Sequence, residues 1–385
     1  MRALSLIAIT FRHFLTRYNY DSFEYAADGL VVRMDRLVEF ADFHLFYGKA
    51  YAIFAFLFGY SLFLQQKSKG SGFQKYMAAR LFLLLVFACF NSIFFPSGDI
   101  LLLYAIVGLL ILPVIRVRSR WLLFIALFFL LQPIEWIAMV TDLMTKGNPL
   151  SVVSSGALKH DLDTALKSVS VGEAIWLNLT KGQLSAFIWS LESGRLAQTI
   201  GLMLLGFYVG KKGFLLRLIA EGRAALRYLY IPLFIGIFCF SISHLMVGDS
   251  YQAQKLDIIL SNWINLCVAA LYVMIFVSFY EKTIAMYTAH LNAYGRMSLS
   301  NYLFQSLVGG ILFAPFGFDL GDTLSSTYLV VVCFTMIVYQ VIFSNIWLQQ
   351  RNYGPAEYIW RRATSIFFQI KSGNRPIPDY NIKNI

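Results

Sequence analysis

The sequence predicts an all-α integral membrane protein, a bundle of about ten transmembrane helices with both termini in the cytoplasm. Apolar residues make up 58% of the 385 residues and charged residues only 14%, whereas soluble domains carry about 25% charged residues. The apolar residues form long uncharged runs along the whole chain; a signal peptide would be a single run at its start. Basic residues gather in every second connection between these runs, as in multi-pass membrane proteins.

Ten segments have the length and composition of a membrane span, which needs about 20 mostly apolar residues. No linker or repeat divides the chain, so we expect a single domain over residues 1–385. The ten segments are residues 1–17, 46–65, 77–95, 100–115, 121–141, 196–211, 226–246, 258–280, 298–315 and 325–348.

The connections predict the orientation. Lys and Arg fill the connections after the second, fourth, sixth and eighth segments and the tail at 349–385, whereas the remaining connections are acidic or mixed. The positive-inside rule places the basic set in the cytoplasm. The net charge of +11 is therefore a membrane pattern and not the one-sided basic face of a nucleic-acid-binding protein. The connection at 142–195 becomes extracytoplasmic, and residues 172–192 predict an amphipathic helix at the interface or dipping into the bundle.

Two ionisable residues lie on the first segment, where the bilayer makes charge costly and therefore suggests function. Arg2 and His13 are eleven residues apart. They return to within about 20° of the same helix face, about 16 Å apart along the axis. A functional interpretation is an anion-binding Arg at the cytoplasmic mouth below a general base. The alternative is an interfacial Arg and a His near the outer boundary.

The ninth segment carries four polar residues at helical spacing, which form one stripe that must face the bundle interior. Helix–helix hydrogen bonding and a substrate-lining role explain this stripe equally well. The four residues are Ser298, Asn301, Tyr302 and Gln305.

Three further ionisable residues lie near predicted outer ends of helices. Asp99 follows a Ser-Gly turn, where a helix N-cap is the favoured interpretation. Glu135 follows Pro133, and it either pairs with His13 or reaches water. Arg195 opens the sixth segment. No P-loop, zinc or dinucleotide-binding pattern is present, so we expect no metal.

Two C-terminal motifs resemble the signature of the YeiB-like family, bacterial multi-pass membrane proteins of unknown function. They are residues 295–306 (GRMSLSNYLFQS) and 353–361 (YGPAEYIWR). Residues 48–59 and 97–105 resemble the N-terminal half of the same family, so the resemblance covers most of the chain.

The YeiB-like family is similar in fold to the integral-membrane acyltransferases, namely the acyltransferase-three and heparan glucosaminide N-acetyltransferase types. The acyltransferase-three proteins mark their first helix with Arg, ten residues and His, a spacing that Arg2 and His13 fit. YeiB-like proteins more often have Asn at the His position. An acidic residue often precedes the Arg, whereas this chain begins at Met1, so we expect the first helix to lack its start.

The resemblance implies an enzyme of the bacterial cytoplasmic membrane that moves an acyl group, expected to be acetyl, from cytoplasmic acyl-CoA to an extracytoplasmic glycan or small molecule. The expected catalytic residues are His13, Glu135 and Asp99. Residues expected to hold acyl-CoA are Arg2, Arg12 and Lys49. The expected substrate-lining residues are Ser298, Asn301, Tyr302, Gln305 and Arg195. The bilayer and acyl-CoA are the expected partners, and nucleic acid is not.

Two other functions stay open at this point. Intramembrane polar groups mark transport pathways as readily as active sites, so a transporter or flippase for a small or lipid-linked molecule is the rival. No inverted repeat is visible in the sequence, which weighs mildly against it. The third alternative is a non-catalytic relative that retains only the fold.

Overall fold

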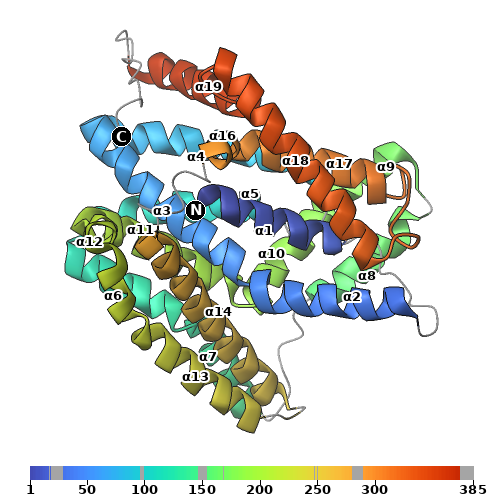
Figure 1. Cartoon of the computed structure of the whole chain (residues 1–385), viewed down its shortest axis with the longest axis horizontal. Coiled ribbons are helices and arrows are strands. Elements are labelled where there is room, and N and C mark those ends of the chain that lie inside the picture. The colour runs from blue at the N-terminus through green and yellow to red at the C-terminus, as the bar shows by residue number, and fades with distance from the viewer. Residues whose placement is uncertain are drawn as a thin grey trace.

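The computed structural model describes residues 1–16, 18, 29–95, 99–145, 154–167, 169–246, 248, 250–279 and 289–372, without the side chains of 71, 289 and 368–372. Within this part of the chain the regular structure is entirely helical (Figure 1). The α-helices are α1 Arg2–Leu15, α2 Leu30–Ala41, α3 Lys49–Lys69, α4 Phe73–Ser92, α5 Ile100–Val114, α6 Ser119–Leu130, α7 Pro133–Met144, α8 Ser155–Leu166, α9 Val171–Leu177, α10 Gln183–Glu192, α11 Arg195–Lys212, α12 Phe214–Glu221, α13 Tyr230–Leu245, α14 Tyr251–Phe279, α16 Ala289–Arg296, α17 Ser298–Phe313, α18 Ser326–Gln350 and α19 Pro355–Ser372. Short π or 3₁₀ turns are η2 Asp42–Phe46, η3 Gly70–Gly72, η4 Asn178–Gly182 and η5 Gly222–Tyr228.

Several of these helices have the character of membrane spans. Four described helices are long and apolar enough to cross a bilayer, or up to six when each of two bent pairs forms one span. The first of the four joins α2, η2 and α3 into a run of 40 residues, Leu30–Lys69; the sequence analysis had placed only residues 46–65 in a span. The chain therefore has the features of an all-α membrane protein, and the count of ten spans stays a prediction.

The predicted span at 121–141 is broken in the structure. Its halves, α6 and α7, meet at an angle of 49°. Pro133 opens α7, and Gln132 before it has a left-handed backbone with φ of 62°. Proline lacks the N–H that would continue a helix and restricts the residue before it, so the break has a local chemical cause.

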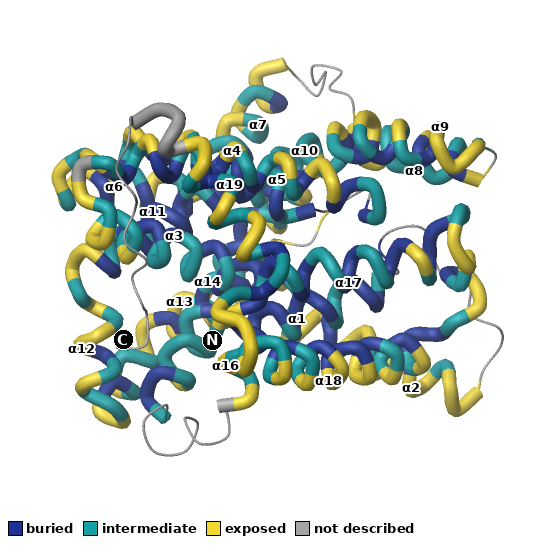
Figure 2. The backbone as a smooth tube through the Cα atoms, turned by 90° about the horizontal axis from the view of Figure 1, so that it is seen from above, coloured by how far each residue is buried: buried dark blue, intermediate teal, exposed yellow. Residues whose placement is uncertain are grey.

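Large apolar side chains cover the outside of the bundle, as a bilayer requires. In α13, Phe234 is 72% exposed and Leu245 is 84% exposed, and in α2 Leu30 is 78% exposed. Figure 2 shows exposed segments along the outer helices and buried segments along α1, α3 and α11. Since so much exposed apolar surface exceeds what soluble monomers present, these faces suit lipid.

Helices α3 and α11 form the tightest contact of the interior. A Cβ atom added to Gly59 of α3 would lie 1.9 Å from the Met203 carbonyl oxygen, and one added to Gly206 of α11 would lie 2.0 Å from that of Phe56. Only glycine permits backbones to approach so closely. The sequence analysis did not single out Gly59. The structure shows that each glycine lies against the backbone of the other helix, Gly59 against α11 and Gly206 against α3.

The connection at 142–195 contains α8, α9, η4 and α10, with residues 146–153 and 168 outside the described part. A capping box opens α9, since the Ser170 hydroxyl accepts from the Glu173 N–H and the Glu173 carboxylate accepts from the Ser170 N–H. The Glu192 side chain at the end of α10 binds Ser155 at the start of α8. These contacts fold the connection into a helical unit.

The two C-terminal motifs of the sequence contact each other. Glu357 of α19 accepts hydrogen bonds from the Leu299 N–H at 2.7 Å and the Ser300 N–H at 3.2 Å. It thereby caps the first turn of α17, where a carboxylate satisfies otherwise unpaired backbone donors. Pro355 is the first residue of α19, a position where its missing N–H removes no helical hydrogen bond. Residues 373–385 of the predicted tail lie outside the described part.

Candidate functional site

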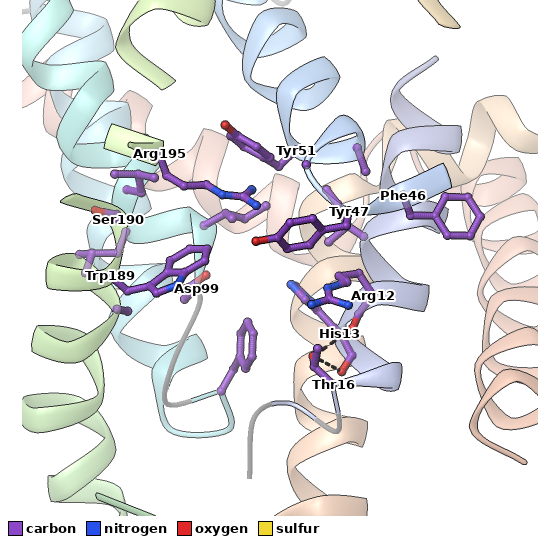
Figure 3. Close-up of a pocket in the computed structure, with 18 of the residues that line it drawn as sticks. Arg12, His13, Thr16, Phe46, Tyr47, Tyr51, Asp99, Trp189, Ser190 and Arg195 are labelled. Atoms are coloured by element: carbon purple, nitrogen blue, oxygen red, sulfur yellow. Dashed lines mark hydrogen bonds between the residues drawn. The ribbon is translucent and has the colours of Figure 1, made fainter. Parts of the chain in front are cut away.

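A cavity of about 160 Å³ lies at the His13 end of α1. Figure 3 shows the side chains that surround it. His13 comes from α1, Asp99 from the turn before α5, Trp189 from α10 and Arg195 from the start of α11, with Tyr51 of α3 on the remaining side. Five helices from four separate parts of the sequence thus contribute side chains to one place, since α10 and α11 follow each other directly.

His13 presents its imidazole to this cavity and is only 8% exposed. Its ring packs against Phe95, with centroids 4.6 Å apart, and lies edge-on to Tyr302 at 5.9 Å. The Nδ1 atom is buried and has no hydrogen-bond partner among the described residues. An unpaired polar atom in such a place costs free energy.

Asp99 combines a structural role with a place on the cavity wall. Its Oδ1 atom accepts a hydrogen bond from the Leu101 N–H at 2.9 Å, which makes it the N-cap of α5. The same oxygen accepts from the Tyr302 hydroxyl at 3.1 Å. The predicted N-cap is therefore confirmed, and the carboxylate also lies beside the cavity that His13 lines.

Two arginines flank the Tyr47 ring at the cavity (Figure 3). The Arg12 guanidinium lies 4.8 Å from the ring centroid and forms an ion pair with Asp42. The Arg195 guanidinium lies 5.2 Å from the same centroid. Lys49 does not line the cavity; its Nζ donates to the Phe43 carbonyl at 3.0 Å.

Arg2 lies at the opposite end of α1 from Arg12. Its guanidinium donates to the Ser61 hydroxyl at 2.7 Å, and Glu357 and Arg80 are its charged neighbours. Ten residues of helix separate Arg2 and Arg12, which is about 15 Å along the axis. The expectation of one acyl-CoA site made of Arg2, Arg12 and Lys49 is therefore not met, because the last two belong to the His13 end.

The polar stripe of α17 faces the interior, as predicted. Asn301, Tyr302 and Gln305 are at most 3% exposed, and Ser298 is partly buried. These residues bond to neighbouring helices: the Asn301 amide donates to the Ser344 hydroxyl at 3.1 Å, and Gln305 accepts from Thr10 of α1.

None of these four residues lines the cavity formed by the described residues. The predicted substrate-lining role of Ser298, Asn301, Tyr302 and Gln305 therefore lacks a cavity to act in. Helix–helix hydrogen bonding accounts for Asn301 and Gln305. Tyr302 affects the cavity through its hydrogen bond to Asp99.

Glu135 is not part of this site either. It is buried at the start of α7, 1% exposed, and does not line the cavity with His13. With its side-chain nitrogen turned toward these acceptors, Gln132 donates to Glu135 Oε2 at 3.1 Å and to the Gly194 carbonyl at 3.2 Å. Glu135 thus supports the bend between α6 and α7, and the expected pairing with His13 does not occur.

The sequence analysis missed the aromatic wall. Tyr47, Tyr51 and Trp189 all contact the Arg195 guanidinium. A partial signal was present, since two tyrosines lie four residues apart at the start of the predicted span at 46–65, although the structure places Tyr47 before the first residue of α3. Trp189 lies in residues 172–192, for which the sequence analysis expected an amphipathic helix at the interface or dipping into the bundle.

One family model matches the C-terminal part of the chain, and the similar proteins match most of its length. The family described as "Protein of unknown function (DUF418)" matches residues 209–367. The uncharacterized protein YxaH of Bacillus subtilis is 27% identical over 344 residues, which cover 83% of this chain and 80% of the relative. The uncharacterized protein YeiB of Escherichia coli is 25% identical over 351 residues, 82% of this chain and 81% of the relative. No solved structure matches. These matches confirm the resemblance to the YeiB-like family of uncharacterised bacterial proteins.

Proposed function

We propose that the protein is an acyltransferase of the bacterial cytoplasmic membrane that uses cytoplasmic acyl-CoA, with acetyl-CoA as the proposed donor, and an extracytoplasmic acceptor. The observation that carries the proposal is His13, a buried imidazole with an unpaired Nδ1 on the wall of a cavity. Histidine is the side chain that most often serves as a general base in enzymes. Burial on a rigid helix beside Asp99 and aromatic rings suits such a base.

The chemistry needs one proton acceptor and no metal. The O–H or N–H group of the acceptor adds to the thioester carbonyl of acyl-CoA, and His13 takes the proton. The C–S bond then breaks, an ester or amide remains on the acceptor, and coenzyme A leaves as a thiol with that proton. Arg2, about 16 Å from His13 along α1, is in this proposal the residue that binds the coenzyme's phosphates, and the extended arm of the coenzyme spans the distance.

The second candidate is a transporter for a small anion. Arg195, a cation in a cavity at one end of the bundle, favours it, since charged groups within membrane proteins mark transport pathways.

One experiment distinguishes the two candidates. Purified protein in detergent is incubated with acetyl-CoA and candidate acceptors while the release of free thiol is measured. Thiol release that depends on acceptor supports the acyltransferase; uptake into proteoliposomes without thiol release supports the transporter and rejects the enzyme.

The proposal includes ten spans with both termini inside, which places the His13 end of α1 outside. In a variant with all four native cysteines replaced by alanine, His160→Cys of α8 should react with an impermeant maleimide in intact cells. Lys212→Cys at the end of α11 should react only after the membrane is disrupted. Both side chains are exposed, so the reverse pattern would contradict the orientation.

A further inference from the structure

Arg195 occupies an unusual position for a cation. Its guanidinium lies 4.0 Å from the centroid of the Tyr51 ring, 5.2 Å from that of Tyr47 and 5.2 Å from that of Trp189. Aromatic faces attract a guanidinium, but they do not neutralise its charge. No Asp or Glu of the described residues forms an ion pair with it.

The other charged groups at or near the cavity have at least one partner each, although Asp99 Oδ2 is buried without one among the described residues. Arg12 is paired with Asp42, Asp99 accepts from Tyr302 and from the α5 backbone, and Lys49 donates to a backbone carbonyl. Arg195 is thus the cation on the cavity wall that has no ion-pair partner among the described residues. It is partly exposed, so a ligand that enters the cavity can supply the counter-charge, because a guanidinium binds acid groups through paired hydrogen bonds.

The size and lining of the cavity limit which ligands can supply this counter-charge. Its volume of about 160 Å³ holds roughly five water molecules at about 30 Å³ each. That is room for an acid group and part of one ring, and far too little for a whole coenzyme. The aromatic rings of Tyr47 and Trp189 offer flat apolar faces beside the cation, a lining that small-molecule sites combine with a few placed polar groups.

We infer that the molecule bound in this cavity is an acidic small molecule or sugar whose carboxylate or phosphate is held by Arg195, with its ring against Tyr47 and Trp189. The inference rests on the proposed function and names its acceptor class: an acceptor with an acid group at Arg195 and a hydroxyl or amine directed at His13. A guanidinium binds both acid types through two parallel hydrogen bonds, so carboxylate and phosphate are separate arms of the test.

The test measures binding without acyl-CoA, using glucuronate, glucose 1-phosphate and glucose as probes and calorimetry on the detergent-purified full chain. At least one of the two acids should bind about tenfold or more tightly than glucose, because hydrogen bonds between charged groups contribute most to such sites. In Arg195→Gln the preference should fall to about one, and in Arg195→Lys it should be partly retained, since Lys provides a point charge without the fork.

The control variant is Arg116→Gln. Arg116 is exposed just beyond α5, about 24 Å along the helix from Ile100 at the cavity. The substitution therefore removes the same charge far from the cavity, and the variant should keep the preference for acids. Equal affinity of all three probes, failure of both acids to bind, or an unchanged preference in Arg195→Gln would each overturn the inference.

The outcomes separate this inference from the proposed function. Acid binding that depends on Arg195, without acceptor-dependent thiol release, would retain the inference and reject the enzyme. Thiol release with neutral acceptors that is unaffected by Arg195→Gln would retain the enzyme and reject the acidic acceptor.

Discussion

The protein buries polar side chains in two regions, and the two differ in the kind of group that is left without a partner. In the stripe of α17, Asn301 bonds to Ser344 and Tyr294 and also accepts from Gln340 through its backbone, and the unpaired atom is the Nε2 of the neutral Gln305 amide. At the cavity, His13 keeps an unpaired Nδ1 and Arg195 lacks a carboxylate partner among the described residues. An unpaired atom alone therefore does not separate the two regions; a titratable ring and a cation beside a cavity do.

The sharpest test of this difference is His13→Ala. We expect turnover, measured as acceptor-dependent thiol release, to fall by about 100- to 10,000-fold, the usual contribution of a general base. Donor binding, measured by calorimetry with acetyl-CoA, should change little. His290→Ala is the matched control, since His290 is exposed on α16 and should retain full turnover. Full turnover in His13→Ala would reject the proposed mechanism.

Arg2→Ala tests the other end of α1. We expect acetyl-CoA to bind about 10- to 100-fold more weakly, because a charge-assisted hydrogen bond contributes about 1.5–3 kcal/mol. Turnover at saturating acetyl-CoA should be partly retained. An equal loss of turnover at all donor concentrations would show instead that Arg2 acts on the chemical step or on folding.

Asn301→Ala examines the stripe of α17. It removes the amide's hydrogen bonds to the Tyr294 carbonyl on α16 and the Ser344 hydroxyl on α18, and we expect a decrease in the free energy of unfolding of about 1–3 kcal/mol. Thermal unfolding in detergent checks this loss. Turnover per folded molecule should be unchanged. A drop in turnover without loss of stability would instead give Asn301 a role in the site and contradict the difference between the stripe of α17 and the cavity.

Tyr302→Phe lies between the two regions and should have the smallest effect. It removes only the hydroxyl that donates to Asp99, and we expect a loss of about 1 kcal/mol in stability and a change in turnover of less than about tenfold. An effect as large as that of His13→Ala would identify the Tyr302 hydroxyl as part of the chemistry.

The sequence predicts the helices better than it predicts the site. Hydrophobic runs and basic connections locate α3, α4, α14 and α18 because bilayer burial acts on every residue of a span. The same signal does not show α2, whose charged residues interrupt its apolar face, or the bend at Gln132, which depends on a single backbone conformation.

Within the site, His13, Asp99, Arg12 and Arg195 meet as residues of one cavity, although the sequence suggested each for a separate reason. The predicted pairing of Glu135 with His13 was wrong, because a sequence does not show which face of a short broken helix packs against its neighbours. Lys49 was misplaced for a related reason: its charge is visible in the sequence, but the backbone carbonyl that it binds is not.

The glycine contact between α3 and α11 has a consequence for affinity. Gly59 and Gly206 hold the two backbones against each other, so the helices that carry Tyr51 and Arg195 behave as one rigid unit. A ligand therefore meets a cation and an aromatic face already at their final spacing and loses little of its binding free energy to ordering them. Discrimination between ligands should accordingly follow the shape and charge of the ligand itself.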